Sequence, residues 1–163
     1  MKKYELTTEV QTFFGLKLHR IRALISFGNV TVGELGGWVE KEENLSHEGD
    51  AWVSGNAEVS GNAWVSGDAE VSGDARVYGN AEVYGVGAIF WIGGIGSRNG
   101  TTTFFHCKDK QIRVTCGCFF GTIAEFAAKV QKTHTNNKHG KVYMASIELA
   151  KEYFELQSEE GVS

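Results

Sequence analysis

A six-residue pattern of apolar and polar positions runs through the middle of the chain. Between Gly49 and Gly85 the sequence reads GDAWVS GNAEVS GNAWVS GDAEVS GDARVY GNAEVY G, so alanine and valine recur two positions apart in every hexad. Side chains two residues apart on a strand share a face, so each alanine–valine pair predicts a short strand with a uniform apolar inner face. The Gly-Asn and Gly-Asp pairs tolerate unusual backbone angles and predict tight turns between these strands.

Stacking of such short, nearly identical strands buries the same residues on one another. The pattern, an aliphatic residue followed four positions later by a small one, resembles that of hexapeptide-repeat proteins with a left-handed parallel β-helix. The resemblance implies three hexads per triangular coil, with residues eighteen apart stacked roughly 4.8 Å from each other. Arg76 would then lie above Glu58 and Asn80 above Asn62, whereas Asp68 above Asp50 would be unfavourable.

The flanking N-terminal segments are less regular. We expect residues 1–30 to form strands that cap the open end of the array. Residues 31–92 form the predicted β-helix, in which Val39 and Leu45 are six apart but Leu45 and Val53 are eight apart. This spacing predicts a small insertion in the first coil.

Residues 93–163 predict a small α+β domain. The runs TTTFFHC and QIRVTCG are β-rich and indicate a hairpin. Thr122 followed by Glu125 has the spacing of a capping box, which predicts a helix running to about His134. A second amphipathic helix is expected to follow a polar turn at 135–140. The predicted fold class is mostly β: a short left-handed parallel β-helix followed by a β-hairpin and two α-helices.

The C-terminal segment also carries a resemblance. The strings GSRNGTTTFF and CGCFFGT are similar to a domain found in many phage and prophage proteins, commonly behind repeats of the GNAxVYG type. The likeness covers residues 93 to about 156. It implies a viral or prophage origin and no settled activity.

Aromatic residues on the outer positions of the hexads suggest an oligomer. Hexapeptide-repeat proteins usually pack three β-helices side by side, so the resemblance implies a homotrimer. Trp52 and Trp64 would be the apolar anchors of its interface, with Tyr78 and Tyr84 beside them. Alternatively, the tryptophans cover the insertion or the C-terminal domain.

Composition narrows the possible partners and the compartment. The 163 residues carry a net charge of −4, so no general basic field attracts nucleic acid. The N-terminal residues lack the apolar run of a signal peptide, and no stretch is long and apolar enough to span a membrane. Three cysteines are an odd number and favour reduced thiols. We therefore expect a cytoplasmic protein, located in the bacterial host if a phage encodes it.

A dense polar segment follows the hexads and is the predicted ligand site. Its glycines allow close backbone approach, its amides and hydroxyls can surround an anion, and Arg98 can bind a phosphate bidentately. The segment matches neither a Walker loop nor a dinucleotide fingerprint. Alternatively, it is a linker and strand start in which Arg98 caps the hairpin. The predicted binding residues are Ser97, Arg98, Asn99, Gly100, Thr101, Thr102 and Thr103.

The sequence gives weaker support for metal binding and for catalysis. Cys116 and Cys118, with Cys107 and His106, lack a typical zinc-ligand spacing. If Cys107 and Cys116 face each other in the hairpin, they are more simply core thiols. No metal site, no catalytic residue and no cofactor is predicted, and His134 and His139 are interpreted as solvated or helix-end residues.

Three functions remain open. The first is a non-catalytic, trimeric, phage-encoded protein that sequesters a small anionic, nucleotide-like ligand or otherwise inhibits a host defence factor. The second is a structural module in which the C-terminal helices dock on a protein partner. The third is a small hexapeptide-type acyltransferase, which the absence of histidine between His47 and His106 disfavours.

Overall fold

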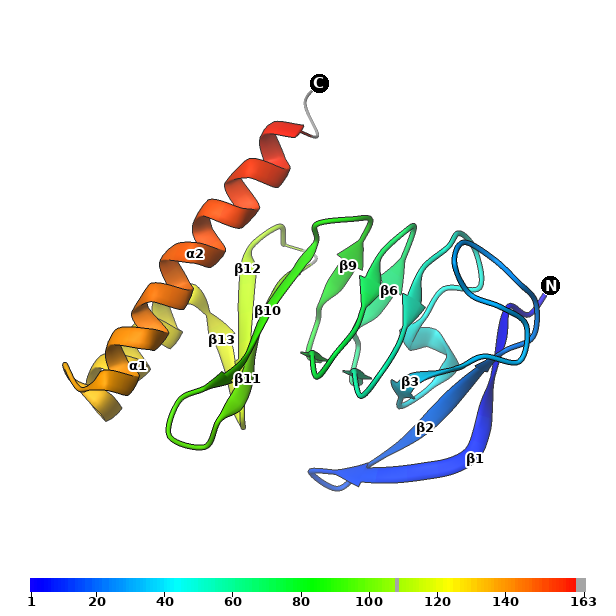
Figure 1. Cartoon of the computed structure of the whole chain (residues 1–163), viewed down its shortest axis with the longest axis horizontal. Coiled ribbons are helices and arrows are strands. Elements are labelled where there is room, and N and C mark those ends of the chain that lie inside the picture. Colours follow the sequence, from blue (N-terminus) through cyan, green and yellow to red (C-terminus); the bar gives the residue numbers. More distant parts are fainter. Residues whose placement is uncertain (108, 161–163) are drawn as a thin grey trace. The chain divides into compact units, whose positions relative to one another are not determined.

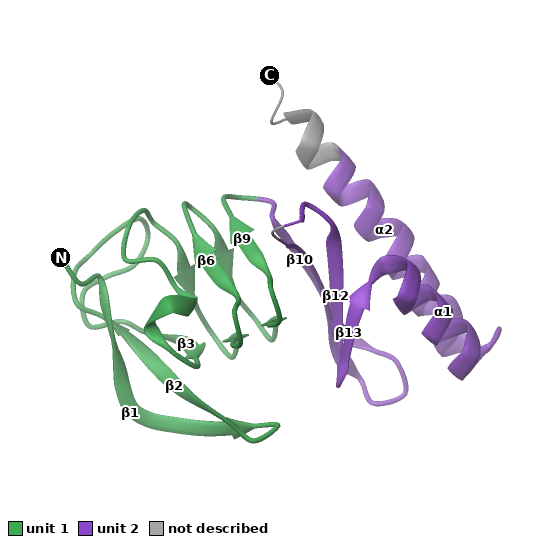
Figure 2. Ribbon diagram, turned by 180° about the vertical axis from the view of Figure 1, so that it is seen from behind, with its two compact units in different colours: residues 1–86 green, residues 87–163 purple. Residues whose placement is uncertain are grey.

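The computed structural model describes residues 1–107 and 109–160 of the chain (Figure 1). The chain divides into two compact units, coloured separately in Figure 2. Unit 1 comprises Met1–Val86, and unit 2 begins at Gly87.

An antiparallel hairpin opens unit 1. Strands β1 (Tyr4–Phe13) and β2 (Leu16–Ala23) pair, with an irregularity in register between Leu6 and Val10. Strand β2 continues the sheet by antiparallel pairing with β3 (Leu35–Val39). Leu18 and Ile21 are fully buried, which anchors the hairpin to the rest of unit 1.

The hexads form strands of two or three residues that pair in parallel. Trp52 pairs with Glu70, Glu58 with Arg76 and Trp64 with Glu82, so the predicted register of eighteen residues is confirmed. The strands are β4 (Trp52–Val53), β5 (Glu58–Val59), β6 (Trp64–Ser66), β7 (Glu70–Val71), β8 (Arg76–Val77) and β9 (Glu82–Tyr84).

The predicted contacts between hexads are also present. Arg76 Nε lies 3.3 Å from Glu58 Oε2, and Asn62 Nδ2 donates to Asn80 Oδ1 over 3.5 Å. Upstream, Trp38 pairs with Glu58 and Leu45 with Val65, a register of twenty residues. The two extra residues are the predicted insertion, which lies between Leu45 and Val53. The 3₁₀ helix η1 (Glu42–Asn44) directly precedes Leu45.

The predicted inner face of the hexads is confirmed. Every alanine and valine of the six Ala-x-Val units is at most 1% exposed. Each buried valine contributes roughly 1.5–3 kcal/mol relative to an exposed one. The residues between and after each alanine–valine pair are expected to point outward, but this is only partly correct, because Ser60, Ser66 and Trp52 are buried too.

The predicted left-handed β-helix is wrong, whereas the mostly β content and the two C-terminal helices of the predicted fold class are present. The described strands belong to separate small sheets, and none of these sheets is closed. The N-terminal hairpin adds antiparallel strands to one row of hexads, which makes a five-stranded mixed sheet β1-β2-β3-β5-β8. The other hexad strands form the two-stranded sheets β4-β7 and β6-β9, because the N-terminal strands extend only the row that contains β5 and β8.

Unit 2 contains an antiparallel sheet in the order β10-β11-β12-β13. Its strands are β10 (Ile89–Ile95), β11 (Gly100–His106), β12 (Ile112–Cys116) and β13 (Phe119–Thr122). The predicted hairpin is present as the central β11–β12 pair. The sheet has two further strands, β10 and β13, that the predicted hairpin lacks.

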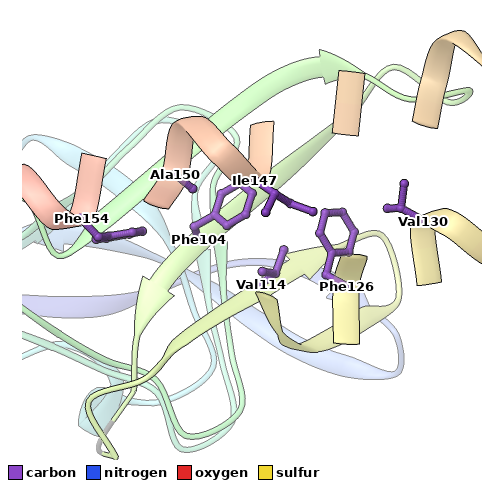
Figure 3. Close-up of a cluster of buried hydrophobic side chains, with 7 residues drawn as sticks. All are labelled: Phe104, Val114, Phe126, Val130, Ile147, Ala150 and Phe154. Carbon is purple, nitrogen blue, oxygen red and sulfur yellow. The ribbon is translucent and has the colours of Figure 1, made fainter. Parts of the chain in front are cut away.

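Two helices cover one face of this sheet (Figure 1). Helix α1 (Ile123–His134) begins at Thr122, whose capping box with Glu125 is formed as predicted, and α2 (Lys138–Glu160) follows. Figure 3 shows the core between helices and sheet. Its buried residues are Phe104, Val114, Phe126, Val130, Ile147, Ala150 and Phe154.

Candidate functional site

A cleft of about 320 Å³ lies within unit 2, beside the hydrophobic core. The loop between β10 and β11, the turn between β12 and β13, and helices α1 and α2 all contribute to its lining. The lining residues are Ser97, Arg98, Gly100, Cys116, Gly117, Cys118, Phe119, Phe126, Lys129, Val130, Thr133, His134 and Tyr143.

The β10–β11 loop is held against α2 by a close approach at Gly96. Gly96 is buried and has a φ of +80°, and a Cβ atom there would lie 1.9 Å from the Tyr143 hydroxyl oxygen. The Asn99 amide donates to the Gly96 carbonyl over 3.2 Å, and Asn99 itself has a φ of +49°. Only glycine fits at position 96 without moving Tyr143 or the loop.

The structure brings three of the seven predicted binding residues to this cleft. Ser97, Arg98 and Gly100 are exposed and line it. Asn99 lies in the tight turn and Thr101 is half-buried, and neither is part of the lining.

The remaining two predicted residues lie inside unit 2. Thr102 and Thr103 are fully buried in β11, where consecutive side chains point to opposite faces of the sheet. The Thr102 hydroxyl donates to Cys116 Sγ over 3.3 Å. Thr102 therefore positions a residue of the cleft lining and does not itself contact the cleft.

Sequence reasoning missed the helical side of the cleft. Phe126, Lys129, Val130, Thr133 and His134 follow one another at spacings of three, one, three and one, which places them on one face of α1. The available signal was this polar set interleaved with the apolar positions of the same face. His134 is the last residue of α1, as the helix-end interpretation predicts, but it is half-buried rather than solvated, and its ring centroid lies 5.5 Å from that of Tyr143.

The charges around the cleft are of one sign. Arg98 and Lys129 contribute positive charges to the described lining, next to His134, and no aspartate or glutamate is part of it. The chain as a whole carries a net charge of −4. The cleft is therefore a local basic site on an acidic protein, which favours anions.

Tyr143 is the polar group of the cleft with the most defined surroundings. Its oxygen accepts a hydrogen bond from the Cys116 thiol, with Sγ and oxygen 3.7 Å apart. Burial is the main cause that raises the pKa of Tyr143 to about 12, and the neighbouring Cys116 adds to the rise, so the phenol keeps its proton at neutral pH.

The predicted interface residues differ in exposure. Trp52 is 4% exposed and packs against Phe27 and Tyr4, with ring centroids 5.4 and 6.3 Å away. Trp64 is 40% exposed and Tyr84 is 70% exposed, whereas Tyr78 is half-buried. Trp52 thus covers the N-terminal segment of its own unit, and Trp64 and Tyr84 remain available to a partner.

A second cavity, of about 300 Å³, lies in unit 1 and has acidic walls. Its lining includes Glu34, Asp50, Asp68 and Glu70. Asp50 and Asp68 are both exposed, so solvent screens the unfavourable pair expected from the sequence.

The described residues contain no group of three or more His, Cys, Asp or Glu side chains arranged to hold a metal ion. Cys107 is a buried thiol, and burial raises its pKa above the ordinary value. Over residues 1–107 and 109–160, none of the helices has the length and apolar character that crossing a bilayer requires.

Comparison with known proteins gives no family assignment. No protein-family model matches the chain, and no curated protein matches it.

Proposed function

We propose that the chain is a non-catalytic binding protein that sequesters a small anionic ligand in the cleft of unit 2. The observation that carries the proposal is the meeting of Arg98, Lys129 and His134 around one cleft whose described lining has no carboxylate. These residues come from two elements about thirty positions apart in the sequence, and the fold unites them.

The residue types suit an anion of modest size. Arg98 presents a planar fork of donors to a phosphate or carboxylate, and Lys129 adds a compact positive charge. Phe126 and Val130 form an apolar wall beside them, which lowers the local dielectric and strengthens attraction. The volume of about 320 Å³ is at the small end of ligand pockets, which span roughly 300–1,000 Å³.

The proposal extends to the setting of the protein. A phage-encoded chain in the bacterial cytoplasm, assembled as a trimer, would remove a nucleotide-like signal from a host defence pathway. This setting rests on the resemblance of the hexads and of the GSRNGTTTFF segment to phage proteins.

The alternative of a protein-docking module has one observation in its favour. Val142 and Leu149 are 43% and 51% exposed and lie seven residues apart on one face of α2. Two separated side chains make a small apolar patch, whereas the cleft next to Arg98 offers a concave site with fixed charges. The ligand-binding function is therefore the better supported one.

Isothermal titration calorimetry tests the proposal with inorganic phosphate, pyrophosphate, adenosine 5′-monophosphate and cyclic di-adenylate as probes. The wild-type protein should bind at least one probe. Arg98→Ala and Lys129→Ala should each weaken that binding at least tenfold, because each removes a charge-assisted contact. Lys132→Ala is the matched control, since Lys132 is an exposed lysine of α1 outside the cleft lining.

The control variant should bind within twofold of wild type. Binding that is equal in wild type and Arg98→Ala, or absent from both for every probe, would contradict the proposal.

A further inference from the structure

We propose that the ligand is a nucleoside monophosphate, one phosphate monoester on a planar heteroaromatic group, and that the Tyr143 hydroxyl donates a hydrogen bond to an acceptor on that group. The inference rests on the proposed function, because it concerns the same cleft. It adds the number of phosphates, the chemical class of the rest of the ligand and a recognition residue.

The charge of the lining limits the ligand to one phosphate. A phosphate monoester carries about −1.5 to −2 charges at pH 7. Arg98 and Lys129 are the permanent cations of the described lining, so they match one such group. A further phosphate would enter the cleft without a cation to compensate its desolvation.

The size of the cleft supports the same limit. A volume of about 320 Å³ is at the lower bound for sites that enclose small ligands. A dinucleotide has about twice the atoms of a mononucleotide, so its second half would remain outside.

The walls of the cleft indicate an aromatic group beside the phosphate. The Phe126 ring lies 5.2 Å from that of Phe119 and 5.6 Å, edge-on, from that of Tyr143. The Tyr143 ring in turn lies 5.5 Å from His134 at an interplanar angle of 34°. Aromatic walls next to guanidinium and ammonium groups favour a flat, polarisable ligand with an anionic end.

A chain of two hydrogen bonds ends at the Tyr143 oxygen and makes this oxygen an acceptor, so the Tyr143 hydroxyl can donate its own hydrogen to a ligand. The Thr102 hydroxyl donates to Cys116 Sγ over 3.3 Å, and the Cys116 thiol donates to the Tyr143 oxygen over 3.7 Å. In this arrangement the Tyr143 oxygen is the acceptor of the Cys116 thiol, so the phenol can direct its own hydrogen into the cleft. A ring nitrogen or carbonyl of the ligand would accept it.

Calorimetric titration with the four nucleoside 5′-monophosphates AMP, GMP, CMP and UMP tests the ligand class. Inorganic phosphate, the parent nucleosides and the cyclic dinucleotides c-di-AMP and c-di-GMP are the comparison probes. At least one monophosphate should bind tenfold or more tightly than inorganic phosphate, its own nucleoside and both cyclic dinucleotides. The inference is overturned if no monophosphate exceeds inorganic phosphate, or if a cyclic dinucleotide binds more tightly than every monophosphate.

A tyrosine variant tests the recognition residue. Tyr143→Phe should weaken the best nucleoside monophosphate about fivefold, the loss of one hydrogen bond, and leave inorganic phosphate unchanged. Tyr153→Phe is the matched control, because Tyr153 is a half-buried tyrosine of α2 outside the cleft lining. Unfolding curves of both variants show whether they remain folded.

The outcomes separate this inference from the proposed function. Arg98-dependent binding of a cyclic dinucleotide alone would uphold an anion site and overturn the nucleoside monophosphate. Wild-type affinity of Tyr143→Phe for the monophosphate, or equal losses for the monophosphate and inorganic phosphate, would overturn the role of Tyr143.

Discussion

Gly96 is the residue on which the shape of the cleft depends most directly. Its φ is +80°, and an added Cβ would lie 1.9 Å from the Tyr143 oxygen. We predict that Gly96→Ala destabilises unit 2 by about 1–3 kcal/mol and lowers anion affinity more than tenfold, because Tyr143 and the Arg98 loop must separate. Thermal unfolding and calorimetry measure the two effects.

Gly94 provides the control for this substitution. Its φ is +72°, but nothing lies within 4 Å of a Cβ built there. Gly94→Ala therefore has similar backbone strain without the steric overlap. Equal effects of the two substitutions on ligand affinity would show that the contact with Tyr143 does not maintain the cleft.

Lys3 makes the stability of unit 1 depend on pH. Its ammonium is buried, and it donates to the Ala51 and Gly49 carbonyls over 2.7 and 3.2 Å. Burial lowers the pKa of Lys3 to about 8, and Asp50 partly offsets that effect. The unfolded chain keeps this proton up to a pKa of about 10.4, so the unfolded state binds more protons between these values and stability rises with pH.

The comparison of wild type with Lys3→Met isolates this contribution. Between pH 7.5 and pH 10, the free energy of unfolding of wild type should gain about 2 kcal/mol relative to the variant. Denaturant unfolding at the two pH values measures the difference. Parallel pH profiles of the two proteins would exclude a lowered pKa for Lys3.

Helix α1 carries one side of the cleft, and its start depends on Thr122. The Thr122 hydroxyl accepts from the Glu125 amide over 3.1 Å, and Glu125 Oε2 accepts from the Thr122 amide over 2.8 Å. Thr122→Ala should destabilise unit 2 by about 0.5–2 kcal/mol in denaturant unfolding. Thr122→Ser keeps the hydroxyl and should restore most of the loss, whereas equally large losses in both variants would point to packing of the threonine methyl group.

The elements with a local signal could be predicted from the sequence, and those defined by tertiary pairing could not. The hexads specify their strands, turns and inner face by their own residues, and Thr122 with Glu125 specifies the start of α1. The hexad pattern does not predict β10, which crosses the expected boundary at residue 92, and no local pattern predicts β13, because both strands are stabilised by pairing with β11 and β12. The mixed sheet was missed for the same reason.

In the candidate site, too, the residues with a local sequence signal could be predicted, and those brought in by tertiary packing could not. Ser97, Arg98 and Gly100 belong to one polar loop that the sequence makes visible. Lys129, His134 and Tyr143 reach the cleft only because α1 and α2 pack on the sheet. In the sequence Lys129 and His134 resemble helix-surface residues and Tyr143 belongs to the apolar pattern of the second helix, so neither helix by itself indicates that these side chains face Arg98.

At the scale of the whole molecule, the exposed aromatic residues of one sheet predict self-association. Trp64 on β6 pairs with Glu82 on β9, and Tyr84 follows two residues later on the same strand. We expect sedimentation equilibrium to give three times the chain mass of 17.9 kDa, and Trp64→Glu to reduce it. Phe14→Glu, at the tip of the β1–β2 hairpin, is the control and should keep the wild-type mass. A monomer of the wild type at micromolar concentration would contradict the trimer.

The location of bound ligand is the most direct test of the central claim that the cleft of unit 2 is an anion site. Titration of the ¹⁵N-labelled protein with adenosine 5′-monophosphate can be followed through its backbone amide resonances. We predict the largest shifts at residues 97–100, 116–118 and 129–134, which surround the cleft. Shifts confined to unit 1, or none at millimolar nucleotide, would contradict the account.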